Sequence, residues 1–238
     1  MKSIVIKISA YKEKDAVVTS LTETGIITFI VKGLLSSKSK NLALNNPLTI
    51  ANLTFSEPGK YKYPVLKEAE IIYSPLNLMG RLKDLALVML LADIINSTMQ
   101  DEEKIVVYKY ILSSLEDIYR NTNINENTLY LIFKILDVSG FAFDVKGCTN
   151  CGSKNNIVTF SFDKGGFVCA NCYDKSERII VEAKSLLKLR ALILAESNTF
   201  DFDPFTEEEF VSILKECLAF IEDNFGIKIK NKELIIKN

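Results

Sequence analysis

Apolar and polar residues alternate along the N-terminal third of the chain in the pattern of β-strands. In the clearest run, every second residue from Ile4 to Ile8 is isoleucine. Similar β-branched or aromatic runs occupy residues 16–21, 26–31, 47–55 and 61–73. Gly25 lies between the second and third runs, where it predicts a hairpin turn. Five short strands in about 70 residues indicate a small barrel, for which the OB-fold is the common five-stranded form.

After Ser74 and Pro75 the apolar spacing becomes that of helices. Residues 77–99 are apolar nearly all round, which is typical of a buried helix. Apolar stripes predict further helices over residues 101–119, 125–139, 182–196 and 206–225. We therefore expect an α+β multidomain protein, with an OB-fold domain over residues 1–75 and an α-helical domain over residues 76–238.

Several residues mark where these helices begin and end. Asp101 and Asn125 are expected to cap the second and third helices. Thr206 and Glu209 have the spacing of a capping box for the last long helix. Glycines at positions 140 and 226 are expected to end the third and last long helices, and residues 228–238 predict a short basic strand or tail.

Two pairs of cysteines interrupt the helical pattern. Cys148 and Cys151 form the first pair, and Cys169 and Cys172 form the second, with seventeen residues between the pairs. Each pair can direct two sulfurs at one ion, and four thiolates suit zinc in a tetrahedral site. We therefore predict a zinc-binding module over residues 146–178, inserted in the helical domain.

The cysteines also allow two disulfides or four reduced thiols, and both alternatives stay open at this point. Residues 157–162 predict a strand and residues 163–166 a turn, so the segment that links the two cysteine pairs is predicted to form a short hairpin. Four sulfur ligands leave no open position on the ion. Such a zinc site is structural rather than catalytic.

Composition excludes several classes of enzyme. The chain contains no histidine. This excludes enzymes whose serine or cysteine nucleophile is activated by histidine, and enzymes that use histidine as the general base. The chain also lacks the glycine-rich motifs that hold phosphates. Cys217 lies on an apolar helical stripe and is expected to be a core residue. We therefore expect a protein that is not an enzyme.

Charge is unevenly distributed although the net charge is only −1. Residues 1–40 carry seven lysines and three acidic residues, whereas residues 81–130 carry five basic and eight acidic residues. A basic end and an acidic middle suggest different partners for different parts of the chain. There is no secretory signal pattern and no apolar segment of about 20 residues that could cross a bilayer. A soluble, cytoplasmic protein is expected.

The predicted barrel carries basic and aromatic residues that together suggest a nucleic-acid surface. Barrels of this type bind single strands through a basic groove and aromatic rings on which bases stack. The basic candidates on or near its loops are Lys14, Lys32, Lys38 and Lys40. The aromatic candidates are Tyr11, Phe29, Phe55, Tyr61 and Tyr63. Solvated lysines and core aromatics are the alternative, and Phe29 is expected to face the core in either case.

With its elements in this order, the chain resembles the RecO family of bacterial recombination mediator (DNA repair) proteins over nearly its whole length. The first group of matching residues comprises Tyr11, Glu13-Lys14-Asp15, Val17-Val18, Leu21-Thr22-Glu23, Gly25, Val31, Lys32 and Gly33. The second comprises Gly140, the four paired cysteines, Gly152, Phe160, Gly165 and Gly166.

The resemblance implies an OB-fold, a helical domain and a zinc-binding insert. It implies binding to single- and double-stranded DNA, annealing of complementary strands, and help in loading the RecA recombinase onto DNA covered by single-strand-binding protein. The protein partners it implies are RecR and the acidic C-terminal tail of the single-strand-binding protein, held on the helical domain, with RecA involved indirectly. It also implies a location at the nucleoid during repair.

The chain departs from the family pattern after the third strand. The family is usually rich in arginine and lysine there, whereas Leu34 and Leu35 follow Gly33 in this chain. DNA contacts are therefore also expected on other surfaces, at Arg81, Lys83, Lys146 or Lys164. The competing hypothesis is a protein–protein scaffold in which DNA contact is incidental, and the near-neutral net charge favours it.

Overall fold

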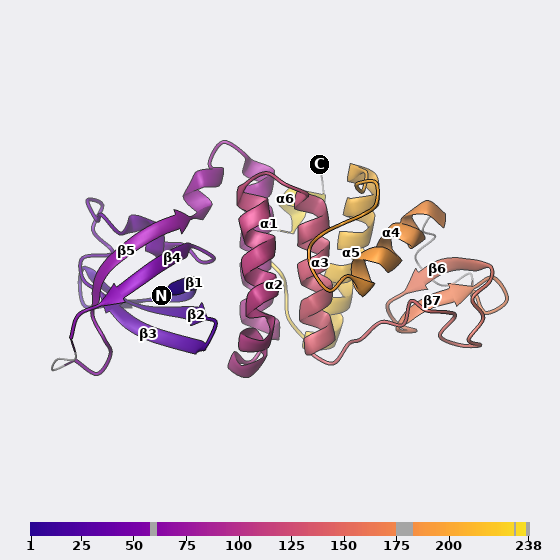
Figure 1. Cartoon of the computed structure of the whole chain (residues 1–238), viewed down its shortest axis with the longest axis horizontal. Coiled ribbons are helices and arrows are strands. Elements are labelled where there is room, and N and C mark those ends of the chain that lie inside the picture. The colour runs from indigo at the N-terminus through magenta and orange to yellow at the C-terminus, as the bar shows by residue number, and fades with distance from the viewer. Residues whose placement is uncertain (58–60, 175–182, 231, 237–238) are drawn as a thin grey trace.

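The computed structural model describes residues 1–57, 61–174, 183–230 and 232–236. A barrel, a group of helices and a two-stranded hairpin follow one another along the long axis of the molecule (Figure 1). The turn predicted at residues 57–59, the helix start predicted at Glu182 and the last residues of the predicted zinc module lie partly or wholly outside this range. In the described part of the chain, every helix is too short or too polar to cross a bilayer.

The barrel is built from five strands, β1 (Lys2–Tyr11), β2 (Asp15–Thr22), β3 (Gly25–Val31), β4 (Ile50–Phe55) and β5 (Leu66–Tyr73). Neighbouring strands are antiparallel, in the order β3-β2-β1-β4-β5. The sheet closes through a parallel bridge between Ile30 and Val65, beside a hydrogen bond from Ile30 N to the Pro64 carbonyl at 2.9 Å. A five-stranded barrel closed in this way is an OB-fold, so the predicted fold is confirmed.

Two strands begin later than their sequence patterns predict. Leu48 has a φ of 59° and donates its N–H to Val5, which delays β4 until Ile50. Pro64 has no N–H for the ladder, and β5 begins at Leu66 rather than at residue 61. The predicted β2–β3 hairpin is confirmed, with Gly25 at a φ of 143°.

Strand β1 is buried on both of its faces in its first half. Val5 belongs to the inner core of the barrel, which also contains the fully buried Phe29, as expected. Ile4 and Ile6 belong to a second, larger core that continues into the helices. Because successive side chains of a strand point to opposite faces, β1 joins the two cores.

The helical part contains α1 (Leu82–Thr98), α2 (Asp101–Tyr119), α3 (Ile124–Val138), α4 (Ala183–Leu194), α5 (Glu207–Phe225) and the short α6 (Glu233–Ile236). The apolar stretch predicted as one helix over residues 77–99 divides into a 3-10 turn, Pro75–Leu78, and α1. Helix α1 is buried along most of its length, as its nearly continuous apolar sequence predicts. The division of the chain into domains at residues 75 and 76 stays a prediction.

Helix ends agree with the sequence in part. The Thr206–Glu209 capping box is present, Gly226 ends α5 in the left-handed region, and Cys217 is fully buried. Asp101 is not the cap of α2, because the carboxylate of Glu103 accepts the N–H of Gln100 one residue earlier.

Two further predictions, for the start of α3 and for the C-terminal segment, are wrong. Asn123, in the left-handed region, precedes α3, and not Asn125. Glu233–Ile236 form the helix α6, where a basic strand or tail is predicted; Ile235 of this helix is buried, and Lys232 just before it forms an ion pair with Glu222 of α5.

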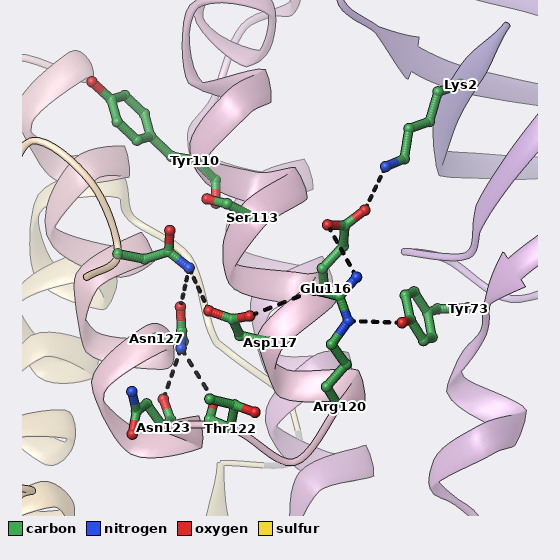
Figure 2. Close-up of polar contacts among 11 residues, drawn as sticks. Lys2, Tyr73, Tyr110, Ser113, Glu116, Asp117, Arg120, Thr122, Asn123 and Asn127 are labelled. Carbon is green, nitrogen blue, oxygen red and sulfur yellow. Dashed lines mark hydrogen bonds and ion pairs between the residues drawn. The ribbon is translucent and has the colours of Figure 1, made fainter. Parts of the chain in front are cut away.

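Polar contacts hold the barrel against α2 (Figure 2). Lys2 of β1 forms an ion pair with Glu116, and Arg120 donates to the hydroxyl of Tyr73 in β5 at 2.9 Å. The buried hydroxyl of Tyr119 also donates to the Leu48 carbonyl at 2.9 Å. The barrel and the helices are thus fixed to each other by hydrogen bonds as well as by their shared core.

We expect Ile4→Ala to lower the free energy of unfolding by about 2–5 kcal/mol, because it removes buried methyl groups where barrel and helices share a core. Leu82→Ala, at a side chain that is 74% exposed, is the matched control and should cost well under 1 kcal/mol. Urea denaturation followed by circular dichroism measures both. Equal losses in the two variants would contradict the shared core.

Candidate nucleic-acid interface and metal centre

Two tyrosines and two lysines come together at one end of the barrel. Lys12 Nζ lies 5.3 Å from the ring centroid of Tyr11 and 5.9 Å from that of Tyr61. Lys32 Nζ lies 5.3 Å from the same Tyr61 centroid. We call Tyr11, Lys12, Lys32 and Tyr61 the tyrosine–lysine cluster. It joins the turn after β1, the end of β3 and the segment before β5, which are far apart in the sequence.

Backbone contacts explain why these segments converge. The carboxylate of Asp15 accepts the N–H of Gly33 at 2.8 Å, and Leu35 donates its N–H to the Lys14 carbonyl at 3.0 Å. These bonds tie the turn between β1 and β2 to the residues that follow Lys32. Lys12 has a φ of 60°, as expected for a tight turn.

The cluster combines exposed rings with cationic groups. Tyr11 and Tyr61 are 36% and 44% exposed, and both lysine side chains lie at the surface. Among the described residues, Lys12 and Lys32 form no ion pair, so their charge is available to a ligand. Exposed rings on which bases stack, beside cations that neutralise phosphates, are the parts of a single-strand-binding surface. The loops that follow the first and fourth strands are also where OB-folds bind oligonucleotides.

The other candidates on the barrel differ in position. Lys14, Lys38 and Lys40 are exposed, but no described contact joins the last two to the cluster. Phe29 packs edge-on against Phe55 at 5.2 Å in the inner core, where it cannot stack on a base.

Sequence reasoning missed two lysines near these rings. Lys12 belongs to the cluster, and Lys62 Nζ lies 5.4 Å from the ring centroid of Tyr63. Each is the direct neighbour of a tyrosine in the sequence, and this adjacency is the pattern from which both lysines could have been predicted as site residues.

Arg81 has a different environment from the exposed lysines. Its guanidinium donates to the carbonyls of Ile118 and Tyr119 at 3.3 and 3.1 Å, and lies 3.2 Å from a carboxylate oxygen of Asp84. An arginine placed in this way adds hydrogen bonds to the last carbonyls of α2. Lys83 is also paired, with Glu207. These contacts favour a structural role for both side chains.

The four paired cysteines meet at the far end of the molecule from the barrel. Their sulfurs all lie within 4.8 Å of one another, with Cys151 Sγ and Cys169 Sγ at 3.6 Å. A tetrahedral zinc ion with ~2.3 Å bonds holds its sulfurs about 3.8 Å apart. The thiols are free rather than disulfide-bonded. The four residues fit a metal ion in both number and spacing.

The local backbone supports this arrangement. Gly152 has a φ of 73° and donates its N–H to the Cys148 carbonyl at 2.8 Å, which closes the first tight turn. Burial raises the pKa of Cys148, but backbone N–H groups, chiefly of Cys169 and Cys151, outweigh it and lower the pKa to about 6. The pKa of Cys151 moves the other way, to about 12: the Ser153 backbone lowers it, but hydrogen bonds with the sulfurs of Cys169, Cys172 and Cys148 outweigh that effect. The cysteines thus share protons in one network, and a metal ion bound there would displace them.

A hairpin of β6 (Ile157–Ser161) and β7 (Gly166–Cys169) links the two pairs, as predicted. It packs on the helices through a cluster of phenylalanines. The rings with centroid separations of 4.9 to 6.2 Å are Phe133, Phe141, Phe143, Phe160, Phe162, Phe167, Phe220 and Phe225. These rings come from α3, the hairpin, α5 and the segments between them, and they attach the cysteine-bearing hairpin to the helical core.

Comparison with known families and proteins gives one result along the whole chain. Residues 1–75 match the family model described as recombination protein O N terminal, and residues 79–233 match recombination protein O C terminal. A protein of Clostridium perfringens (strain 13 / Type A) is 29% identical over 239 residues, covering 98% of this chain and 95% of its own. A protein of Caldanaerobacter subterraneus subsp. tengcongensis is 27% identical, covering 99% and 96%. One of Bacillus subtilis (strain 168) is 22% identical, covering 98% and 92%. All three are named DNA repair protein RecO.

We expect Gly166→Ala to disrupt the cysteine-bearing hairpin, because an added Cβ would lie 2.0 Å from the Asp144 carbonyl oxygen. Gly165→Ala is the matched control: it also has a positive φ, of 73°, but no atom lies within 4 Å of its Cβ. The control should lose roughly 1 kcal/mol, and Gly166→Ala clearly more. Thermal denaturation at a fixed metal concentration separates them, and equal melting temperatures would refute the close packing of Gly166.

Proposed function

The chain belongs to the RecO family of DNA repair proteins, and on that premise we propose that it is a non-catalytic recombination mediator. In this role it binds DNA, anneals complementary single strands and helps to load the RecA recombinase onto DNA covered by single-strand-binding protein. Its partners are RecR and the acidic tail of the single-strand-binding protein, and its place of action is the nucleoid. The observation that carries the DNA-binding step is the tyrosine–lysine cluster.

Annealing needs no bond chemistry, only a surface that lets two polyanions approach each other. Lys12 and Lys32 neutralise phosphates, which lowers the repulsion between strands. Tyr11 and Tyr61 offer ring faces that hold bases unstacked from their neighbours and free to pair. A side chain that acts as acid, base or nucleophile has no place in this scheme.

We also propose that the four paired cysteines hold one structural zinc ion. The supporting observations are the spacing of the four sulfurs and the attachment of the hairpin to the phenylalanine cluster. An ion with four sulfur ligands has no open coordination position, and its contribution is to fold the hairpin.

We expect Lys12→Ala with Lys32→Ala to weaken binding of an oligothymidine and to reduce its salt dependence. Removing two phosphate contacts lowers the slope of log K against log salt by about 1.4 for a single strand. Lys38→Ala with Lys40→Ala is the control of equal charge and should change the slope less, because no described contact joins these lysines to the cluster. Fluorescence anisotropy across a salt series measures both.

The same pair of variants tests annealing. The native protein should accelerate duplex formation by two complementary labelled oligonucleotides, and the acceleration should fade with salt and be weakest in the Lys12/Lys32 variant. If the native protein neither binds nor anneals DNA at low salt without a partner, the proposed DNA-binding function is refuted and the protein–protein scaffold hypothesis is favoured. If only the Lys38/Lys40 variant loses annealing, the DNA-binding surface is the loop before β4 and not the tyrosine–lysine cluster.

We expect the purified protein to contain one zinc ion, and Cys148→Ser or Cys169→Ser to lose it. Structural zinc contributes on the order of 10 kcal/mol to the folding of its module, so the melting temperature should fall sharply. Cys217→Ala is the control, since it removes a thiol of the helical core and leaves the metal content intact. Elemental analysis with thermal denaturation tests this, and an unchanged melting temperature after metal removal would argue against a structural ion.

A further inference from the structure

We propose that Cys151 is a site of oxidation by hydroperoxides, and that Cys169 is the thiol that converts the oxidised Cys151 into a disulfide. The inference rests on the proposed zinc site for its consequence, which is release of the ion. Of the five cysteines, Cys151 alone is exposed, whereas Cys148, Cys169 and Cys217 are buried and Cys172 is intermediate. An oxidant in solution therefore reaches Cys151 first.

The cysteine cluster has the geometry from which a disulfide can form. Cys151 Sγ lies 3.6 Å from Cys169 Sγ, and all four paired sulfurs lie within 4.8 Å of one another. An S–S bond is about 2.0 Å long, so a small shift brings the two sulfurs to bonding distance. Cys169 ends β7 and is only 2% exposed. It can therefore react with an oxidised Cys151 beside it while it is itself shielded from an oxidant in solution.

The surroundings of the first cysteine pair are positively charged. Lys146 and Lys154 flank this pair in the sequence, and together with Arg190 of α4 they line a groove of about 270 Å³. None of the three forms an ion pair among the described residues, and the lining of the groove contains no acidic residue. Cysteines that react selectively are partially exposed and lie in electropositive surroundings. Cys217 has the opposite environment, because it is fully buried in the helical core.

The reaction has two steps and consumes one molecule of hydrogen peroxide. With the ion bound, Cys151 is a thiolate, which is the nucleophilic form. It attacks one peroxide oxygen, the O–O bond breaks, and a sulfenic acid and a hydroxide ion form. The Cys169 thiolate then attacks the Cys151 sulfur, the S–O bond breaks, a second hydroxide leaves and the disulfide forms. Two electrons thus pass from the two sulfurs to the peroxide, and two protons from solvent convert both hydroxides to water.

Formation of this disulfide removes two of the four metal ligands. Cys148 and Cys172 cannot complete a tetrahedral zinc site by themselves, so the ion should leave. The new bond joins the two cysteine pairs, so the hairpin keeps one covalent link in place of the metal. The tyrosine–lysine cluster, at the other end of the molecule, should keep its affinity for oligothymidine (Figure 1).

The test adds hydrogen peroxide in steps to the full chain loaded with zinc. We expect one zinc ion to be released, as measured with a colorimetric chelator, for each peroxide consumed. Peptide mapping by mass spectrometry should find the Cys151–Cys169 disulfide, with Cys217 still reduced. Dithiothreitol and added zinc should restore the metal content, because disulfides are reversible products of oxidation.

Two variants that each lose one ligand of the second pair separate the chemistry of Cys169 from loss of the metal. Cys169→Ser should stop at the sulfenic acid of Cys151, which dimedone traps and mass spectrometry locates. Cys172→Ser is the matched control, because it keeps both reacting thiols and should still form the Cys151–Cys169 disulfide.

Three results would overturn the inference. They are first oxidation at a paired cysteine other than Cys151, a disulfide between Cys148 and Cys151 in the native chain, and no more dimedone adduct in Cys169→Ser than in Cys172→Ser. The proposed metal site and the inference can fail separately. A chain purified without zinc that still forms the Cys151–Cys169 disulfide refutes the metal site alone. A zinc-loaded chain whose thiols stay reduced at a peroxide concentration that oxidises free cysteine refutes the inference alone.

Discussion

Burial of the outer face of the barrel against the helices is the interaction on which the rest of this structure depends. Ile4 and Ile6 of β1 and Ile50 of β4 belong to the same hydrophobic core as the helices. That core continues through α1, α2 and α3 to the phenylalanines that attach the cysteine-bearing hairpin. One large core thus extends from the outer face of the barrel through the helices to the hairpin, beside the separate inner core of the barrel. Apolar burial is not directional. The hydrogen bonds of Arg120 and Tyr119 therefore help to fix the orientation of the barrel relative to the helices.

The helices keep the two candidate sites apart. The tyrosine–lysine cluster belongs to the barrel, and the β6–β7 hairpin, which carries Cys169, lies at the opposite end of the molecule (Figure 1). Between them, Arg81 donates to the last carbonyls of α2, and Lys83 pairs with Glu207. These two side chains therefore differ from Lys12 and Lys32 of the cluster, which form no ion pair among the described residues.

The cysteine-bearing hairpin is small, and its own strands cannot bury enough apolar surface to be stable alone. The cysteine cluster fixes one side of the hairpin, and the phenylalanine cluster fixes the other side to α3 and α5. Gly166 allows the chain to pass against the carbonyl of Asp144, an approach that no other residue type permits. Cysteines, rings and glycine therefore act together to place the hairpin against the helices.

The sequence by itself determined the strands of the barrel, the long helices and the four cysteines. These features depend on local periodicity, on spacing and on residue chemistry, which can be read without the fold. It did not reveal that Arg81 is occupied at a helix end, that Lys12 joins Lys32 around Tyr61, or that three cations surround a groove at α4. Those facts depend on contacts between segments far apart in the chain. Only the closure of the barrel and the docking of the hairpin bring such segments together, because both are products of long-range packing and not of local pattern.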